Sequence, residues 1–201
     1  DFPIGASITA GRHDVMLFSD GGKAVRFDEN DVRPMGRTAR GVRGITLKRD
    51  DRVVDLAVIR PGMSLLTICE NGYGKRTDID EYRVQSRGGV GIISIHTTSR
   101  NGQVVGVACV RGEDELMLIT QLGKALRLPT SGIRAIARAT QRVRLTATAA
   151  ADPVVLAVPT SLYTPFGRGC VKAVELAIEE NNAAGGVKIG NEKRPQVAVV
   201  G

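Results

Sequence analysis

The chain has 201 residues, of which 42% are hydrophobic and 24% charged, and its net charge is +7. This composition suffices for a core in one or two domains, and no apolar run reaches the roughly 18 residues of a membrane span. Aromatic residues are only 3% of the chain, which argues against a single-strand binder that stacks bases on rings. The three cysteines are widely spaced and predict buried thiols of a cytoplasmic protein. The first residues lack the regions of a signal peptide, so we expect none there.

The positive charge is confined to one part of the chain. Residues 1–145 carry 23 Lys and Arg against 16 Asp and Glu, whereas residues 146–201 carry five of each. Such asymmetry is typical of a protein with an acidic partner such as nucleic acid.

A pattern of about 50 residues recurs three times, with cores at residues 15–46, 65–96 and 116–146. Aligned without gaps, Gly22 coincides with Gly72 and Gly123, so the offsets are 50 and 51 residues. A period of this size predicts a repeat architecture, in which each unit buries its apolar face against its neighbours.

Each repeat predicts a β-hairpin around its glycine turn, followed by a polar connector and a further strand. The strands we expect in the three repeats are residues 15–19, 23–27, 45–47, 53–59, 64–69, 74–77, 92–96, 104–110, 115–120 and 124–128. Short strands with regular turn signals favour an all-β, propeller-like or barrel-like array. The pattern ends in the third repeat, where Arg142 stands in the column of Gly41 and Gly91.

Arginine recurs at three columns of the repeat alignment. The first column holds Arg26, Arg76 and Arg127, the second holds Arg33, Arg83 and Arg134, and the third holds Arg37, Arg87 and Arg138. One interpretation is a solvated surface with scattered ion pairs. The other, which we favour, is a row of phosphate-binding points, because guanidinium groups donate to phosphates in bidentate fashion. With Arg40, Arg43, Lys75 and Lys124, these nine arginines are the predicted contacts to duplex DNA.

Residues 146–152 predict a linker, and the composition changes after them. A strand over residues 153–158, a helix over 166–182 and a strand over 197–200 are the start of a parallel βαβ unit. The segment 153–201 is therefore expected to be an incomplete α/β unit, too small to fold alone.

Features of an enzyme are lacking in the sequence. His13 and His96 lie in no metal-ligand or triad spacing, and the glycines of residues 88–91 lack the context of a phosphate loop. Tyr73 and Tyr82 lie within the repeat pattern and are expected to pack or to face DNA. We therefore predict no catalytic residue, no metal site and no cofactor.

The repeats resemble a known family. The stretches Met16-Leu17-Phe18-Ser19, Gly41-Val42-Arg43-Gly44-Ile45, Asn71-Gly72-Tyr73-Gly74-Lys75-Arg76-Thr77 and Arg100-Asn101-Gly102-Gln103-Val104-Val105-Gly106 are similar to the C-terminal domain of the DNA gyrase A protein. The resemblance implies a mainly β fold, a partial β-pinwheel of about three blades with a basic rim that bends duplex DNA. It also implies partners in the remainder of gyrase, namely the gyrase B protein and the N-terminal region of gyrase A. The open edges of a partial disc predict self-association.

Residues 153–201 resemble a second family, the periplasmic solute-binding proteins of the branched-chain amino acid type. The similarity lies in residues 171–186, which match their first helix and the turn after it. We interpret the chain as a chimera. The function predicted from the gyrase resemblance is a non-catalytic, sequence-tolerant DNA-binding and wrapping module of an ATP-dependent type II topoisomerase. The alternative is a fragment of a periplasmic small-molecule binding protein.

Overall fold

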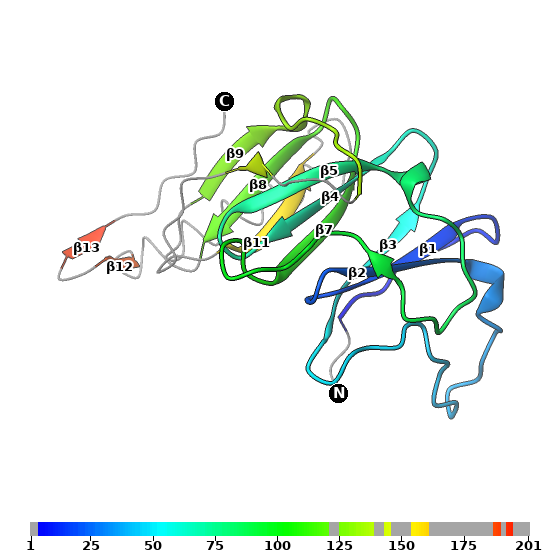
Figure 1. The fold of residues 1–201 in the computed structure, drawn as a ribbon. Helices are drawn as coiled ribbons and strands as arrows, with labels where there is room; N and C mark the ends of the chain where they lie inside the picture. The colour runs from blue at the N-terminus through cyan, green and yellow to red at the C-terminus, as the bar shows by residue number, and fades with distance from the viewer. Residues whose placement is uncertain are drawn as a thin grey trace.

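A computed structural model describes residues 4–120, 125–138, 143–145, 154–160, 187–189 and 192–194. The strands in the repeats are β1 (Asp14–Ser19), β2 (Lys23–Asp28), β3 (Val53–Ile59), β4 (Ser64–Cys69), β5 (Tyr73–Asp78), β6 (Ile92–Ile93), β7 (Val104–Val110), β8 (Glu115–Thr120), β9 (Ala125–Pro129) and β10 (Val143–Arg144). Three one-turn 3-10 helices follow the hairpins: η1 (Glu29–Asp31), η2 (Ile79–Glu81) and η3 (Thr130–Gly132). Beyond the repeats lie β11 (Val154–Thr160), β12 (Val187–Ile189) and β13 (Glu192–Arg194). Figure 1 shows their arrangement.

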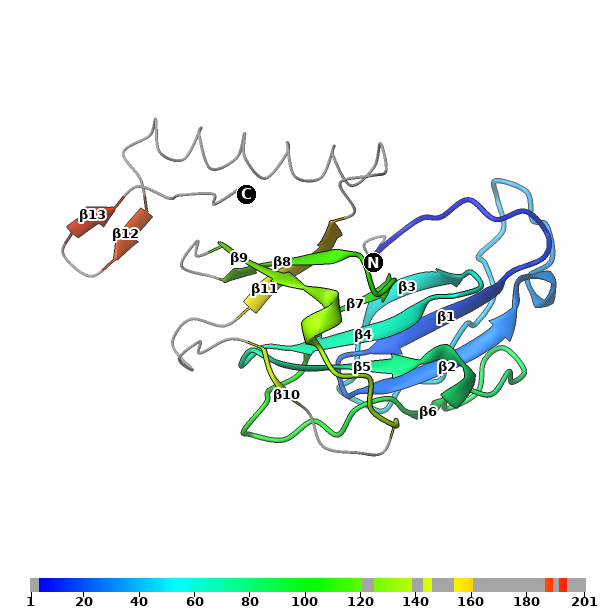
Figure 2. The same cartoon turned by 90° about the horizontal axis from the view of Figure 1, so that it is seen from above.

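In the described part of the chain, β1 to β11 form three blades, which confirms the expected partial pinwheel. The first blade has the order β3-β1-β2-β6, the second β10-β5-β4-β7, and the third β11-β8-β9. In the first two blades the hairpin of one repeat is flanked on both sides by strands of the next repeat. Each of these blades is therefore complete only with its successor, and Figure 2 shows the hairpins stacked in sequence.

Steric constraints explain why glycine occupies the hairpin turns of the repeats. Gly22 and Gly72 adopt positive φ angles of 80° and 72°, which residues with a side chain rarely adopt. A Cβ on Gly22 would lie 2.1 Å from the carbonyl oxygen of Ile95. The carbonyl of Gly22 accepts hydrogen bonds from the backbone N–H groups of Ser94 and Ile95, so the turn also holds the following repeat in place.

Apolar side chains fill the spaces between blades. Successive residues of a strand point to opposite faces, so Leu65 packs toward the first blade and Leu66 toward the third. The cluster between the first and second blades includes Met16, Phe18, Leu65, Cys69, Ile79, Tyr82 and Ile95. The cluster between the second and third includes Leu66, Ile68, Val110, Leu116, Leu118 and Ile133. The equivalent residues Leu65 and Leu116 are both fully buried in these clusters.

The segment after the repeats differs from its prediction in both of its described parts. The strand expected at residues 153–158 is present as β11, but it pairs antiparallel with β8 and joins the third blade instead of starting a separate parallel sheet. An unpaired edge of β8 exposes backbone donors and acceptors, and an apolar run can pair with them. Strands β12 and β13 pair with each other, in a region where no strand was expected.

The remaining expectations for this segment, the linker at residues 146–152, the helix at 166–182 and the strand at 197–200, lie outside the described residues. Within the described part of the chain, no helix is long and apolar enough to cross a membrane.

Candidate nucleic-acid interface

The first arginine column is engaged inside the protein. The Nε and Nη2 atoms of Arg26 each lie 2.7 Å from one carboxylate oxygen of Asp14. Its Nη1 donates to the carbonyl oxygens of Ile79 and Tyr82, at 3.0 and 2.9 Å. Arg26 therefore joins its own hairpin to the η2 turn of the next blade, and its donors are directed away from solvent.

Of the other two residues in this column, only Arg127 has an equivalent ion pair in the described part of the chain. Arg127 pairs with Glu115, which occupies in the third repeat the position that Asp14 has in the first. Arg76 is half-buried, and its Nε has no hydrogen-bond partner among the described residues. The second repeat has Ser64 where the others have a carboxylate, which leaves Arg76 without that ion pair.

Two arginines of the third column also bind protein carbonyls. Arg87 donates to the carbonyl oxygens of Arg43, at 2.5 Å, and Asp31, at 3.2 Å. Arg138 donates to the carbonyl oxygen of Ile93 at 2.7 Å. Arg43 and Ile93 are 50 residues apart and occupy equivalent places, so these arginines tie each repeat to the one before it.

Lys75 is fully buried, at 0% exposed. Its Nζ donates to the carbonyl oxygens of Arg138 and, at 3.5 Å, of Ala137. Burial lowers the pKa of Lys75 to about 8, and the positive charge of Arg138 acts in the same direction. The ammonium has no access to a phosphate in this position. The repeat alignment indicated that this position is buried, because the residues equivalent to Lys75 are the apolar Val25 and Leu126.

The second column is exposed and evenly placed. Arg33, Arg83 and Arg134 are all solvent-exposed, and each directly follows the residue that ends a 3-10 turn. Two of those end residues are firmly buried, Tyr82 at 1% and Ile133 at 3% exposed. The Tyr82 hydroxyl also shares a hydrogen bond of 2.8 Å with the Ser94 hydroxyl. In the second and third blades the structure thus presents an exposed guanidinium from an anchored backbone.

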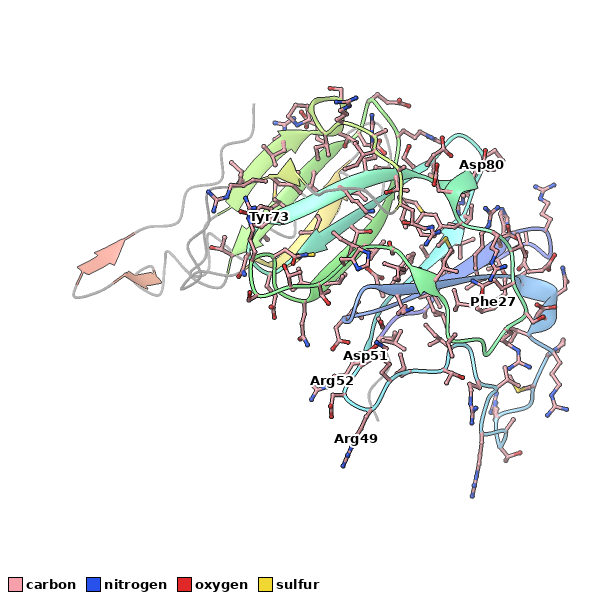
Figure 3. All side chains as sticks on the ribbon, viewed as in Figure 1. Phe27, Arg49, Asp51, Arg52, Tyr73 and Asp80 are labelled. Carbon is pink, nitrogen blue, oxygen red and sulfur yellow. The ribbon has the colours of Figure 1, made fainter. Side chains whose placement is uncertain are left out.

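A second exposed group lies in the loop after η1, where Arg37, Arg40 and Arg43 are all exposed. Sequence reasoning did not include Arg49 and Arg52, which are also exposed and lie in the loop before β3. Figure 3 shows Arg49 projecting away from the blades. Lys124 lies outside the described residues.

Acidic side chains lie in two of the three 3-10 turns that precede the arginines of the second column. The first turn of η1 contains Glu29 and Asp31, and that of η2 contains Asp80 and Glu81. The η3 turn has no acidic residue in its first turn. The first turn of η3 itself therefore adds no repulsion of an anion near Arg134, unlike the first turns of η1 and η2.

The two repeat tyrosines are packing residues. Tyr73 is 7% exposed and Tyr82 is 1% exposed. The guanidinium carbons of Arg100 and Arg144 lie 5.3 and 5.4 Å from the centre of the Tyr73 ring, a cation–π arrangement. Both arginines thereby pack against the first residue of β5 in the second blade.

Comparison with known proteins places these repeats in a family. The model of the DNA gyrase C-terminal domain, a β-propeller, matches residues 13–60, 64–111 and 114–146. The chain belongs to this gyrase C-terminal domain family. The three matched spans follow the three repeats, and the second arginine column lies within them.

Curated gyrase A proteins are similar to the chain over the same region. The gyrase A protein of Salmonella typhimurium is 51% identical over 152 residues, which are 76% of this chain and 17% of that protein. That of Escherichia coli is 48% identical over 152 residues, again 76% and 17%. That of Staphylococcus aureus is 43% identical over 144 residues, 71% and 16%. The chain thus spans about one sixth of the length of these relatives.

Solved structures share the fold. A gyrase A C-terminal domain has a TM-score of 0.69 at 28% identity, covering 74% of this chain and 50% of that one. The C-terminal domain of a DNA topoisomerase IV has a TM-score of 0.71 at 20% identity, covering 85% and 52%, which shows the fold alone. The family model's matches end at residue 146, and these findings do not favour the solute-binding alternative.

Proposed function

We propose that the repeats are a non-catalytic module that binds and wraps duplex DNA through contacts to phosphates, irrespective of base sequence. The observation that carries the proposal is the second arginine column, which recurs at equivalent and exposed positions in all three repeats. Family membership supports it, because the relatives are components of DNA gyrase.

The proposed contact set is narrower than the sequence alone suggested. Arginines whose donors bind protein carbonyls or carboxylates have fewer left for a phosphate. We therefore assign structural roles to Arg26, Arg127, Arg87, Arg138 and Lys75, and leave the half-buried Arg76 out of the contact set. The contacts then fall to the exposed residues Arg33, Arg37, Arg40, Arg43, Arg83 and Arg134, with Lys124 as a further predicted contact. Exposed guanidiniums neutralise phosphates and release condensed counterions, which favours binding to any duplex.

The parent assembly is part of the proposal. The module would act in the bacterial cytoplasm beside a gyrase B protein and the N-terminal region of a gyrase A protein, with cleavage and ATP-dependent chemistry residing in those parts. Its own task would be to bend DNA around the rim of the blades, so that the duplex segment presented for passage has a defined path.

A salt titration tests the proposal. The full chain is titrated with two duplexes of unrelated sequence, by fluorescence anisotropy, between about 50 and 200 mM salt. If each of the six exposed arginines contacts one phosphate, the logarithm of the binding constant should fall against the logarithm of salt with a slope near about −5.4 for both duplexes. A slope near zero, or a large preference for one duplex, would overturn the proposal.

A further inference from the structure

We propose that β11 acts as a substitute blade strand, which closes the third blade from a segment outside the gyrase-type repeats. In this role the outer edge of β8 is a strand-acceptor site, and its occupant is residues 154–160 of the same chain. The edge would take an extended, valine-rich peptide by backbone hydrogen bonding, the mode known as β-augmentation.

The first support is the position of β11. In the first blade β1 pairs with β3, and in the second blade β4 pairs with β7, each strand coming from the next repeat. In the third blade β8 pairs with β11. Strand β3 lies next to β7, and β7 lies next to β11, so β11 continues the series of strands (Figure 1).

The second support is an identical register. Asp14, Ser64 and Glu115 are equivalent residues at the start of the three hairpins. Their partners are the last residues of the flanking strands, Ile59, Val110 and Thr160 respectively. All three flanking strands have seven residues, so β11 has the length and the end point of a blade strand.

The third support is a shared irregularity. The register against β3 shifts between Phe18 and Ser19, and the register against β7 shifts between Ile68 and Cys69. The register of β11 against β8 shifts between Val154 and Leu156, beside the equivalent residues Ile119 and Thr120. A bulge is a specific local feature of a strand pair, so its repetition at the same place is evidence of an equivalent fit.

The sequences agree with this equivalence. The three strands read VVDLAVI, VVGVACV and VVLAVPT, and each begins with two valines. Of these three, only β11 contains a proline, Pro159, and β11 is an edge strand, where proline is tolerated. The open edge of β8 would otherwise present unpaired backbone groups to other chains.

Cysteine cross-linking in the full chain tests the register. In a background with Cys69, Cys109 and Cys170 replaced by Ala, the pair Met117→Cys and Val158→Cys joins directly opposed residues. The matched control, Met117→Cys with Leu156→Cys, is displaced by two residues along β11. We expect a disulfide in the first pair at least about tenfold more than in the control, measured by mass spectrometry after mild oxidation. Equal yields would overturn the proposal.

Hydrogen exchange tests the acceptor site independently. Ala157→Pro removes a backbone donor in the middle of β11, so protection of the β8 amides should fall at least about tenfold while that of the β1 amides is unchanged. A synthetic peptide of residues 150–163 added in excess should restore protection of β8. Unchanged β8 protection in Ala157→Pro, or no effect of the peptide, would contradict a strand-acceptor role for β8.

Discussion

Replacing Arg26 by Met separates an arginine that stabilises the fold from one that binds DNA. Arg26 is 16% exposed, and Asp14 beside it is 21% exposed. The substitution leaves Asp14 without its ion pair and removes the donor to the carbonyls of Ile79 and Tyr82. Methionine keeps most of the aliphatic stem, so lost packing contributes little.

The expected loss follows from those contacts. A hydrogen bond to a charged group contributes roughly 1.5–3 kcal/mol, and breaking a buried ion pair costs about 3–5 kcal/mol. Because water reaches part of this site, we discount these values and expect Arg26→Met to lower the free energy of unfolding by about 2–4 kcal/mol. The matched control Arg33→Met, at an exposed position, should change it by less than about 0.5 kcal/mol.

Urea denaturation followed by far-ultraviolet circular dichroism measures both variants, since the chain has no tryptophan. Urea is uncharged and leaves the ion pair unscreened. Duplex affinity, corrected for the folded fraction, should be nearly unchanged in Arg26→Met and reduced in Arg33→Met. Equal stabilities of the two variants, with weaker DNA binding by Arg26→Met, would refute the division between structural and DNA-contacting arginines.

Three further outcomes are expected. Gly22→Ala should lower the free energy of unfolding by more than about 3 kcal/mol, because its Cβ would meet the Ile95 carbonyl. Gly11 has a similar φ angle but no neighbour within 4 Å of an added Cβ, so Gly11→Ala should cost only about 1 kcal/mol. Thermal and urea unfolding compare the two variants, and equal costs would contradict the steric explanation. The pKa of Lys75 is lowered from 10.5 to about 8 in the folded protein, so between these pH values the unfolded chain binds more protons than the folded chain. Burial of the charged ammonium therefore lowers the free energy of unfolding by its full amount below pH 8, and by progressively less as the pH rises to 10.5. The stability of Lys75→Met relative to the native chain should therefore decline by about 3 kcal/mol from about pH 8 to 10.5, and a constant difference would exclude a lowered pKa. Arg134→Ala should weaken duplex binding more than Arg33→Ala, because no acidic residue lies in the first turn of η3; anisotropy titrations measure the two variants, and the reverse order would contradict this electrostatic argument.

The hairpins could be predicted from the sequence because each depends on local chemistry, whereas the strand expected at 45–47 is absent and that expected at 92–96 is only Ile92–Ile93. Glycine at the turn and alternating apolar residues specify a hairpin, and strands 53–59 and 104–110 have the predicted bounds. The repeat then requires each unit to present the same two faces, which is why Leu65 and Leu66 could be expected to pack on opposite sides.

Local sequence patterns could not distinguish the arginines that bind the protein from those that are exposed and available for DNA contact. Recurrence shows that a guanidinium is needed at a place, but phosphate binding and bonding between blades impose the same requirement. The deciding contacts join residues far apart in the chain, such as Arg138 and Ile93. A partial clue was present in the acidic residues Asp14 and Glu115, which lie across the hairpin from Arg26 and Arg127.

The antiparallel pairing of β11 with β8 also could not be predicted from the sequence. An apolar run of seven residues is compatible with a parallel or an antiparallel sheet, and the choice depends on which edge is available. The available edge is that of β8 in the third hairpin, and the sequence of residues 154–160 alone does not indicate that these residues pair there.

The most direct test of the central claim compares two triple variants of equal charge. The first carries Arg33→Gln, Arg83→Gln and Arg134→Gln; the second carries Arg12→Gln, Arg60→Gln and Arg111→Gln, which are also exposed. Duplex binding across salt should show the slope reduced by about 2.7 in the first variant, since each lost phosphate contact removes about 0.9, and by less than about 1 in the second. Equal reductions in both would mean that net charge, and not the recurring second column, governs DNA binding.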